Sequence, residues 1–256
     1  GQILQLVENA KYLVSNGIKE IVLTGVNIGD FGIFDINSGE KESNFFELIK
    51  HFNKIRNLSR LRISSIEPNL LSNKIIDFVF NSKKFVNHFH IPLQSGSDKI
   101  LKLMKRRYLT SLYESRIKKI KELMPNCCIG VDVIVGFPGE TDKDFNETFN
   151  FLRKLDISYL HVFSYSDRDN TESNLMENKV PNNLKSKRSK ILRELSLKKK
   201  RVFYENNINS ERPVLFESKN FDGYIFGYTD NYIRVKALWS KDLVDNVINC
   251  KLDYID

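Results

Sequence analysis

The sequence predicts an α/β protein, in which an incomplete parallel β/α barrel that lacks its first strand is followed by a small all-β barrel. Up to about Tyr165, apolar segments that end in small polar residues alternate with segments of helical periodicity, which is typical of parallel strands joined by crossover helices. Beyond Asn207, short alternating segments separated by turn residues indicate antiparallel strands. We therefore expect a partial barrel at 1–183, a basic linker helix at 184–207 and an all-β domain at 208–256.

Size and composition are those of a globular protein. The chain has 256 residues, of which 41% are hydrophobic, and this is enough for one substantial core and a small second domain. Apolar runs fall short of the roughly 18 to 20 residues that span a bilayer, and Gly1–Lys11 does not resemble a signal peptide, so we expect a cytoplasmic protein without a membrane partner. The net charge of +8 suits a polyanion such as RNA, but a merely soluble basic surface would have the same composition.

The cysteines predict neither a disulfide framework nor a metal site. Cys127 and Cys128 are adjacent and Cys250 is far away, whereas four-ligand sites use paired CxxC spacings. Cys127 and Cys128 are predicted to be buried strand residues. We therefore assign no metal ligand to this chain.

The first predicted elements are a helix at 3–14 and a strand at Ile18–Thr24. The strand is uniformly apolar, which favours a parallel strand covered on both faces. The loop Phe31–Ser43 follows its polar tip. A long loop in this position either covers a site or is an insertion without a role, and the sequence favours neither.

The second unit contains a helix at 45–52 and a strand at Leu58–Ser65. Pro68 disfavours continued regular structure after this strand. Asn69 is the expected N-cap of the next helix, Leu70–Phe80, because its side chain can accept a hydrogen bond from a free backbone N–H.

The third strand ends in the most informative stretch, Phe89–Asp98. Gln94 and Ser95 supply hydrogen-bonding groups at the strand tip, and Gly96 permits a backbone that a Cβ would obstruct. Ligands of β/α barrels bind at such carboxyl-terminal tips, so we expect the polar tips of several strands to face one mouth. An ordinary strand-to-helix turn is the simpler interpretation of this stretch taken alone.

A short basic run, Met104–Tyr108, follows this stretch. Its cations, Arg106 and Arg107 among them, could hold a phosphate or a carboxylate. A solvated turn is the equally plausible alternative.

The strand Ile129–Gly136 carries a carboxylate, Asp132, between valines. A buried carboxylate needs a partner, so Asp132 is either a satisfied core group or a ligand to something polar in the mouth. Thr141 is the predicted cap of the following helix, Asp144–Leu155. Ser158–Tyr165 is the last strand of this series.

Two basic features follow the predicted barrel. The helix from Leu184 carries a run of cations over 198–201, which suits either RNA binding or a solvated helix face. In the all-β part, Tyr232, Arg234 and Lys236 alternate along one predicted strand. Rings and cations in alternation suit unpaired bases and phosphates, although a half-exposed strand would show the same pattern.

Taken together, the strand tips resemble a known enzyme family. The region from Gly1 to about Tyr165 resembles the radical S-adenosylmethionine (SAM) methylthiotransferases, and the region from about Ile208 resembles their small all-β TRAM domain. The Gly-Val-Asn-Ile-Gly-Asp and Ser-Ser-Ile-Glu-Pro forms are most similar to the branch that methylthiolates threonylcarbamoyladenosine beside the tRNA anticodon. The segments that carry the resemblance are Thr24–Asp30, Arg62–Pro68, His90–Ser97, Met104–Arg106 and Val131–Thr141.

The resemblance implies that a methylthio group is transferred to C2 of the modified adenosine by radical chemistry. It also implies S-adenosyl-L-methionine as cofactor, two [4Fe-4S] clusters in the full-length enzyme, the tRNA anticodon stem-loop as substrate, and an electron donor such as flavodoxin or ferredoxin. The cofactor-binding residues implied by motif position are Gly25, Asn27, Ser65, Glu67, Gln94, Ser95, Asp132, Val135 and Gly136. The RNA-binding residues expected are Arg106, Arg107, Lys198, Lys199, Lys200, Arg201, Tyr232, Arg234 and Lys236.

The sequence also departs from this family. The family holds its radical-generating cluster on a CxxxCxxC loop after the first barrel strand and a second cluster in an N-terminal domain, and neither segment is in this sequence. We therefore expect a C-terminal fragment, with the cluster ligands outside this chain and no radical chemistry of its own. Two alternatives remain: a non-catalytic RNA-binding protein, and a methylthiotransferase that acts on a ribosomal protein. The sequence predicts no oligomeric state.

Overall fold

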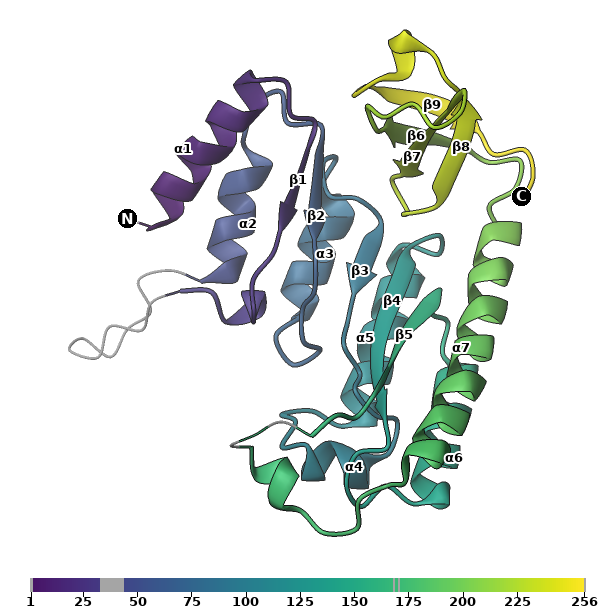
Figure 1. Cartoon of the computed structure of the whole chain (residues 1–256). Coiled ribbons are helices and arrows are strands. Elements are labelled where there is room, and N and C mark those ends of the chain that lie inside the picture. The colour runs from purple at the N-terminus through teal and green to yellow at the C-terminus, as the bar shows by residue number, and fades with distance from the viewer. Residues whose placement is uncertain (1, 33–43, 168, 170, 256) are drawn as a thin grey trace, which may run out of the picture.

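A computed structural model describes residues 2–32, 44–167, 169 and 171–255 of the chain (Figure 1). Parallel strands with helices between them form the larger part, and an antiparallel sheet forms the C-terminal part. This arrangement confirms the predicted α/β class. The loop Phe31–Ser43, for which a covering role was considered, lies mostly outside the described residues.

The first parallel pair joins β1 (Glu20–Leu23) to β2 (Arg60–Ile63), with Glu20 opposite Arg60. Helix α1 (Gln2–Ser15) precedes the pair, and a short 3-10 turn, η1 (Ile28–Asp30), follows β1. Helix α2 (Phe45–Asn53) buries Phe45, Leu48, Ile49 and Phe52, the apolar positions that the helical spacing of the sequence predicts.

The second parallel sheet has the order β3-β4-β5, formed by His88–His90, Cys128–Val135 and Tyr159–Ser164. Its register places Gly130 opposite both His90 and Tyr159, and Asp132 opposite His161. The two sheets adjoin, because the Leu61 N–H donates to the Lys84 carbonyl and the Leu61 carbonyl accepts from Val86.

Strand β4 separates a core face from a polar face. Val131, Val133 and Val135 are fully buried in one core cluster that includes Leu152 of helix α6 (Asp142–Lys154). The alternate residues point to the opposite face, because successive strand side chains alternate. Asp132 therefore projects away from the helices that cover the core, among them α3 (Asn73–Asn81) and α5 (Thr110–Leu123).

The helix caps were predicted with mixed success. Thr141 caps α6 as expected, in a reciprocal capping box with Asp144. The prediction for Asn69 was wrong, because the N–H groups of Leu70 and Leu71 both bond to the Glu67 carbonyl and form a turn before the helix begins. Ser72 caps α3 instead.

Helix α7 (Asn182–Glu205) runs along the outer strand β5 (Figure 1). The Ser196 hydroxyl accepts from the Leu160 N–H at 2.8 Å and donates to the Leu160 carbonyl at 2.9 Å, so the helix occupies hydrogen-bonding groups at this edge of the sheet. A 3-10 turn, η2 (Glu172–Leu175), lies between β5 and α7.

The C-terminal sheet is antiparallel, as the alternation predicts. Its order is β8-β7-β6-β9. The predicted strand from Tyr232 begins at Arg234 instead, because the backbone of Tyr232 has φ of 64° and belongs to a turn that starts at Thr229. The four strands are β6 (Glu211–Phe216), β7 (Tyr224–Thr229), β8 (Arg234–Leu238) and β9 (Val247–Lys251), with the turn η3 (Lys241–Leu243) before β9.

This sheet docks at the amino-terminal ends of the parallel strands. Arg60, at the start of β2, donates to the Tyr228 carbonyl at 2.9 Å and to the Thr229 carbonyl. Asn231 donates to the carbonyl of Asn126, which precedes β4. The carboxyl ends, where ligands of β/α folds bind, are therefore at the other end of the strands. Among the helices described, none is long and apolar enough to cross a membrane.

Candidate functional site

An open cavity of about 1100 Å³ lies at the carboxyl ends of β3, β4 and β5. Its wall includes Gln94 after β3, Asp132 and Ile134 of β4, and Phe163 to Ser166 around the end of β5. The predicted common mouth is thus present for these strands.

Gln94 reaches the cavity from an unusual backbone conformation. Its φ is 70°, in the left-handed region that non-glycine residues rarely adopt. Two hydrogen bonds to β4 hold it there: its N–H donates to the Asp132 carbonyl at 2.9 Å, and its own carbonyl accepts from Ile134 at 2.9 Å. Strain of this kind is retained where the surroundings impose it, often at functional sites.

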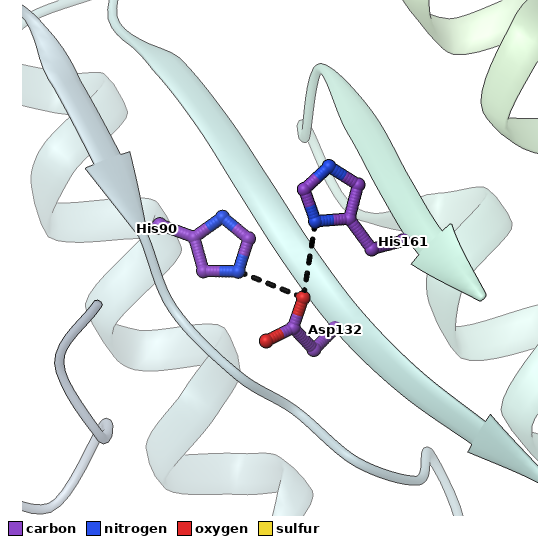
Figure 2. A group of neighbouring side chains, drawn as sticks. All are labelled: His90, Asp132 and His161. Carbon is purple, nitrogen blue, oxygen red and sulfur yellow. Dashed lines mark hydrogen bonds and ion pairs between the residues drawn. The ribbon is translucent and has the colours of Figure 1, made fainter. Parts of the chain in front are cut away.

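Asp132 is bracketed by two histidines from the neighbouring strands (Figure 2). Its Oδ1 lies 2.8 Å from His90 Nε2 and 3.3 Å from His161 Nδ1. Asp132 therefore has side-chain partners, as the first interpretation expects, and it also lines the cavity. Its role as a ligand to a bound group stays a prediction.

Glu67 and Arg106 come together at the cavity. Glu67 Oε1 accepts from Arg106 Nη1 at 3.1 Å, and Arg106 lines the wall. Among the described residues, the buried Arg106 Nε and the buried Tyr165 hydroxyl have no hydrogen-bond partner. Unpaired buried donors are costly, so these two atoms at the cavity are available to a ligand with acceptor oxygens.

Three other predicted cofactor residues, Ser95, Val135 and Gly136, make internal contacts at the ends of the strands. Ser95 is fully buried and its hydroxyl bonds to that of Thr148 at 3.2 Å. Val135 is in the core, and the Gly136 N–H donates to Glu140 Oε1 at 3.0 Å. Gly136 has φ of 76°, and a Cβ there would lie 2.4 Å from the Lys185 side chain.

The tip of β1 is separate from this group. Gly25 and Asn27 are exposed, and Asn27 donates to Asp30 Oδ2 at 2.5 Å. A Cβ on Gly25 would have no atom closer than 3.7 Å, so close packing does not explain the glycine. Ser65, after β2, is half-buried. None of the three is among the described residues that line the cavity of β3 to β5.

The basic residues do not form one path. Arg106 and the exposed Arg107 follow α4 (Asp98–Leu103), at the end of the molecule away from the C-terminal sheet, whereas 198–201 lie where α7 approaches that sheet (Figure 1). Within this run, Lys199 donates to the carbonyls of Arg153 and Leu155 and so satisfies the end of α6.

The other cations of the run remain at the surface. Lys198 and Lys200 are exposed, and Lys200 Nζ lies 5.4 Å from the Tyr204 ring centre. Arg201 is exposed and pairs with Glu205 at 2.8 Å, one turn further along the helix. These three side chains are accessible to a polyanion.

In the C-terminal part, Tyr232 does not share a strand face with the two cations. Its ring packs 4.4 Å from His88, 4.7 Å from the Arg62 guanidinium and 4.8 Å from Tyr228. It therefore lies at the amino end of β3, where these contacts occupy the ring. Arg234 and Lys236 are exposed, over the rings of Phe226 and Tyr224 at 4.4 Å each.

The cysteines do not fit an iron–sulfur cluster. Cys127 and Cys128 are buried, which confirms the prediction, and burial raises the pKa of the Cys128 thiol to about 12 and that of Cys127 further. Cys250 is in β9 of the other sheet. A cluster needs several thiolates that converge on one point, whereas Cys127 and Cys128 are buried neighbours in the chain and Cys250 lies in another sheet.

The functional residues missed by sequence reasoning are His90, His161 and Tyr165. His88 and His90 alternate along β3, so both point to the polar face of the sheet. That alternation was visible in the sequence, but the pairing of Asp132 with His161 depends on strand register, which no local pattern specifies.

Comparison with known proteins supports the fold. The family model described as the radical SAM superfamily matches residues 2–152. Two solved structures share the fold with a TM-score of 0.50: the radical SAM methyltransferase TsrM from Kitasatospora setae, at 15% identity over 63% of this chain and 30% of that chain, and coproporphyrinogen III oxidase (HemN) from Escherichia coli, at 12% identity over 80% of this chain and 46% of that chain.

Curated relatives are more similar in sequence. The threonylcarbamoyladenosine tRNA methylthiotransferase MtaB of Bacillus subtilis is 37% identical over 97% of this chain and 55% of its own length. The tRNA-2-methylthio-N(6)-dimethylallyladenosine synthase of Clostridium botulinum is 36% identical over 94% of this chain and 53% of its own length. The chain thus spans about half the length of these relatives. Because the family model covers more than half of its residues, the chain belongs to the radical SAM superfamily.

Proposed function

We propose that this chain is part of a tRNA methylthiotransferase that transfers a methylthio group to C2 of threonylcarbamoyladenosine beside the anticodon. The observation that carries the proposal is the 37% identity, over 97% of the chain, to the B. subtilis enzyme of that name. The open cavity at the carboxyl ends of β3, β4 and β5 supports it, because it is roomy enough for a cofactor and a nucleobase.

In this proposal the chain has three parts with different tasks. Residues 1–183 are a partial radical SAM barrel, 184–207 are a basic linker helix, and 208–256 are a TRAM-like β domain. Support comes from the parallel sheets, from the single long helix α7 and from the separate antiparallel sheet.

S-adenosyl-L-methionine fits the cavity wall. The unpaired donors on Arg106 and Tyr165 suit the carboxylate or ribose oxygens of such a cofactor, and Glu67 fixes the Arg106 side chain through their ion pair. Gln94 and Asp132 would bind it from the tips of β3 and β4. When bound, the cofactor supplies a methyl group and, beside a reduced cluster, the means to abstract hydrogen.

The remaining predicted cofactor residues are assigned by motif position. Ser95, Val135 and Gly136 would act through the shape of the strand tips, because their present contacts are internal. Gly25, Asn27 and Ser65 would belong to the part of the cofactor site formed by β1 and β2.

Both [4Fe-4S] clusters would need ligands outside this sequence, because its three cysteines do not fit one. We therefore assign no radical step to the residues described here. The electron donor would be a small protein such as flavodoxin or ferredoxin, and the enzyme would work in the cytoplasm.

The anticodon stem-loop would contact the accessible cations. Lys198, Lys200 and Arg201 on α7 and Arg234 and Lys236 on β8 form one group near the C-terminal sheet, and Arg106 and Arg107 form another at the cavity. Lys199 and Tyr232 would act indirectly, by holding α7 and the C-terminal sheet in place.

The test is a nucleoside analysis. The complete reading frame that encodes this chain is expressed anaerobically in a host deficient in tRNA methylthiolation, and bulk tRNA nucleosides are analysed by mass spectrometry. The proposal predicts 2-methylthio-threonylcarbamoyladenosine. The appearance of 2-methylthio-isopentenyladenosine instead would assign the chain to the other tRNA branch, and the absence of both nucleosides would favour an RNA-binding protein or a ribosomal-protein substrate.

A further inference from the structure

The geometry points to a binding site for a single divalent transition-metal ion at His90, Asp132 and His161, a role that the similarity to known proteins does not assign. The three side chains come from three adjacent strands and converge on one point (Figure 2). Two imidazoles and one carboxylate with open positions are a common donor set of mononuclear zinc and non-haem iron sites.

Strand register brings the three donors together. Asp132 is directly opposite His161, and His90 is opposite Gly130, two residues before Asp132 on the same face. The glycine at position 130 makes room on this face for the Tyr159 ring, because a Cβ there would lie 2.3 Å from that ring. The donors are thus positioned by the backbone of a sheet and not by a loop.

Two of the three donor separations are close to those around a bound ion. One ligand atom from each residue lies within 4.8 Å of the others. Donor atoms bound at about 2.1 Å to one ion lie about 3 to 3.4 Å apart in tetrahedral or octahedral geometry. The separation of Asp132 Oδ1 and His161 Nδ1 is already 3.3 Å, and that of Asp132 Oδ1 and His90 Nε2, now 2.8 Å, would need to open slightly.

Charge and access also favour a cation. Among the described residues, the ion pairs of Asp132 are those with the two histidines, so no Lys or Arg neutralises its carboxylate directly. The side chain of His90 is 11% exposed and that of Asp132 23%, which fixes both, whereas that of His161 is 55% exposed and free to adjust. The cavity lined by Asp132 gives an ion and its remaining ligands a way in.

The two imidazole nitrogen donors determine which class of metal ion the site would prefer. Imidazole suits zinc, iron, cobalt and copper, whereas magnesium and calcium prefer oxygen ligands throughout. In the absence of metal, the same three residues form a polar cluster in which Asp132 Oδ1 is hydrogen-bonded to His90 and lies 3.3 Å from His161 Nδ1. That cluster is the competing explanation, and it predicts no stoichiometric binding of any ion.

The experiment titrates the purified, chelator-treated chain with Zn²⁺ by calorimetry, and with Co²⁺ by visible absorption. We expect one ion per chain. Since loss of even an outer partner of a metal ligand typically costs 10- to 100-fold in affinity, His161→Gln and Asp132→Asn should each weaken binding by about 100-fold or more. His161→Gln is the safer variant for folding, because that side chain is the most exposed of the three.

Matched controls exclude other donors. His51→Gln, on α2, makes the same change away from the cluster, and Cys250→Ser removes the partly exposed thiol. Both should bind Zn²⁺ as the unchanged chain does. The proposal is overturned if the unchanged chain binds no ion in stoichiometric amount, or if His161→Gln and Asp132→Asn bind as tightly as His51→Gln. Because no RNA or cluster is involved, these outcomes are independent of the tRNA assay.

Discussion

At the level of single residues, the sequence identified Asp132 as a candidate site residue but did not specify the partner of its carboxylate. A carboxylate between buried valines must have a partner, but the partner comes from another strand, and register sets which one. His90 and His161 were missed because histidines on separate strands show no local pattern that relates them to Asp132. The three adjacent strands had to be aligned before the three side chains could be recognised as one group.

His88 makes stability depend on pH. Burial, with the nearby Arg62, His90 and His161, lowers the pKa of His88 from 6.5 to about 3. The unfolded chain therefore takes up a proton below about pH 6.5 that the folded chain excludes, and the free energy of unfolding falls by about 1.4 kcal/mol per pH unit until about pH 3.

Urea denaturation at about pH 6 and about pH 4.5 measures this effect, because the difference between the two free energies reports proton uptake. His88→Gln should lose about 2 kcal/mol less over this interval than the unchanged chain. An equal loss in His88→Gln would contradict the assignment.

Arg188 and Glu140 form a buried ion pair whose one-sided loss should destabilise the fold. Arg188 Nη1 lies 2.5 Å from Glu140 Oε1, and both side chains are almost fully buried. Arg188→Met would leave the Glu140 carboxylate buried without its partner, so we expect a loss of about 3 to 5 kcal/mol in chemical denaturation.

Two comparisons separate charge from packing. Adding Glu140→Gln to Arg188→Met should recover part of the loss, because the unpaired charge is then removed. Arg193→Met, on an exposed face of the same helix, should change stability by no more than about 0.5 kcal/mol. If the double variant is no more stable than Arg188→Met alone, the pair does not act as described.

At the level of helices and strands, the sequence predicted the strands β1 to β5 and most helices, because each has a strong apolar pattern of its own. Boundaries were less certain. Asn69 could have capped a helix, but the turn from Glu67 to Leu71 delays α3 until Ser72, and such a turn depends on tertiary contacts. The conformation of Tyr232 could not be predicted from local sequence either, since its ring packs against His88 and Arg62, which are far away along the chain.

The capping box of α6 is a testable feature at this level. Thr141 accepts from the Asp144 N–H, and Asp144 accepts from the Thr141 N–H and hydroxyl. Thr141→Ala should therefore lower the free energy of unfolding by about 1 to 2 kcal/mol. Thr110→Ala is the matched control, because α5 has Leu109 at its cap position without a side-chain cap bond. An equal effect of both changes would show that the capping box adds nothing.

At the level of the whole molecule, the C-terminal sheet and the cavity lie at opposite ends of the parallel strands. Arg60 and Asn231 join the sheet to the amino ends, whereas Gln94 and Tyr165 line the cavity at the carboxyl ends. The sequence predicted both parts but not their placement, because interdomain contacts leave no periodic signal. An RNA that reaches both parts must therefore extend along the molecule.

The cysteines give a whole-molecule prediction. In the native chain, a thiol-reactive disulfide reagent should modify Cys250 alone, because Cys127 and Cys128 are buried and burial raises the pKa of both thiols. After denaturation all three thiols should react. Treatment with iron and sulfide under anaerobic conditions should yield no cluster absorption from this chain. A stable cluster on the unchanged chain would show that its cysteines can be brought together.

The proposed transfer of a methylthio group to tRNA is tested most directly by isotopic labelling. The complete reading frame is expressed anaerobically in a methylthiolation-deficient host that is fed methionine with a deuterated methyl group, and the tRNA and ribosomal proteins are analysed by mass spectrometry. The account predicts the deuterated methyl in 2-methylthio-threonylcarbamoyladenosine, and its loss when the cavity is altered by Gln94→Ala with Arg106→Ala. A deuterated methylthio group on a ribosomal protein, or none on the threonylcarbamoyladenosine of tRNA, would contradict it.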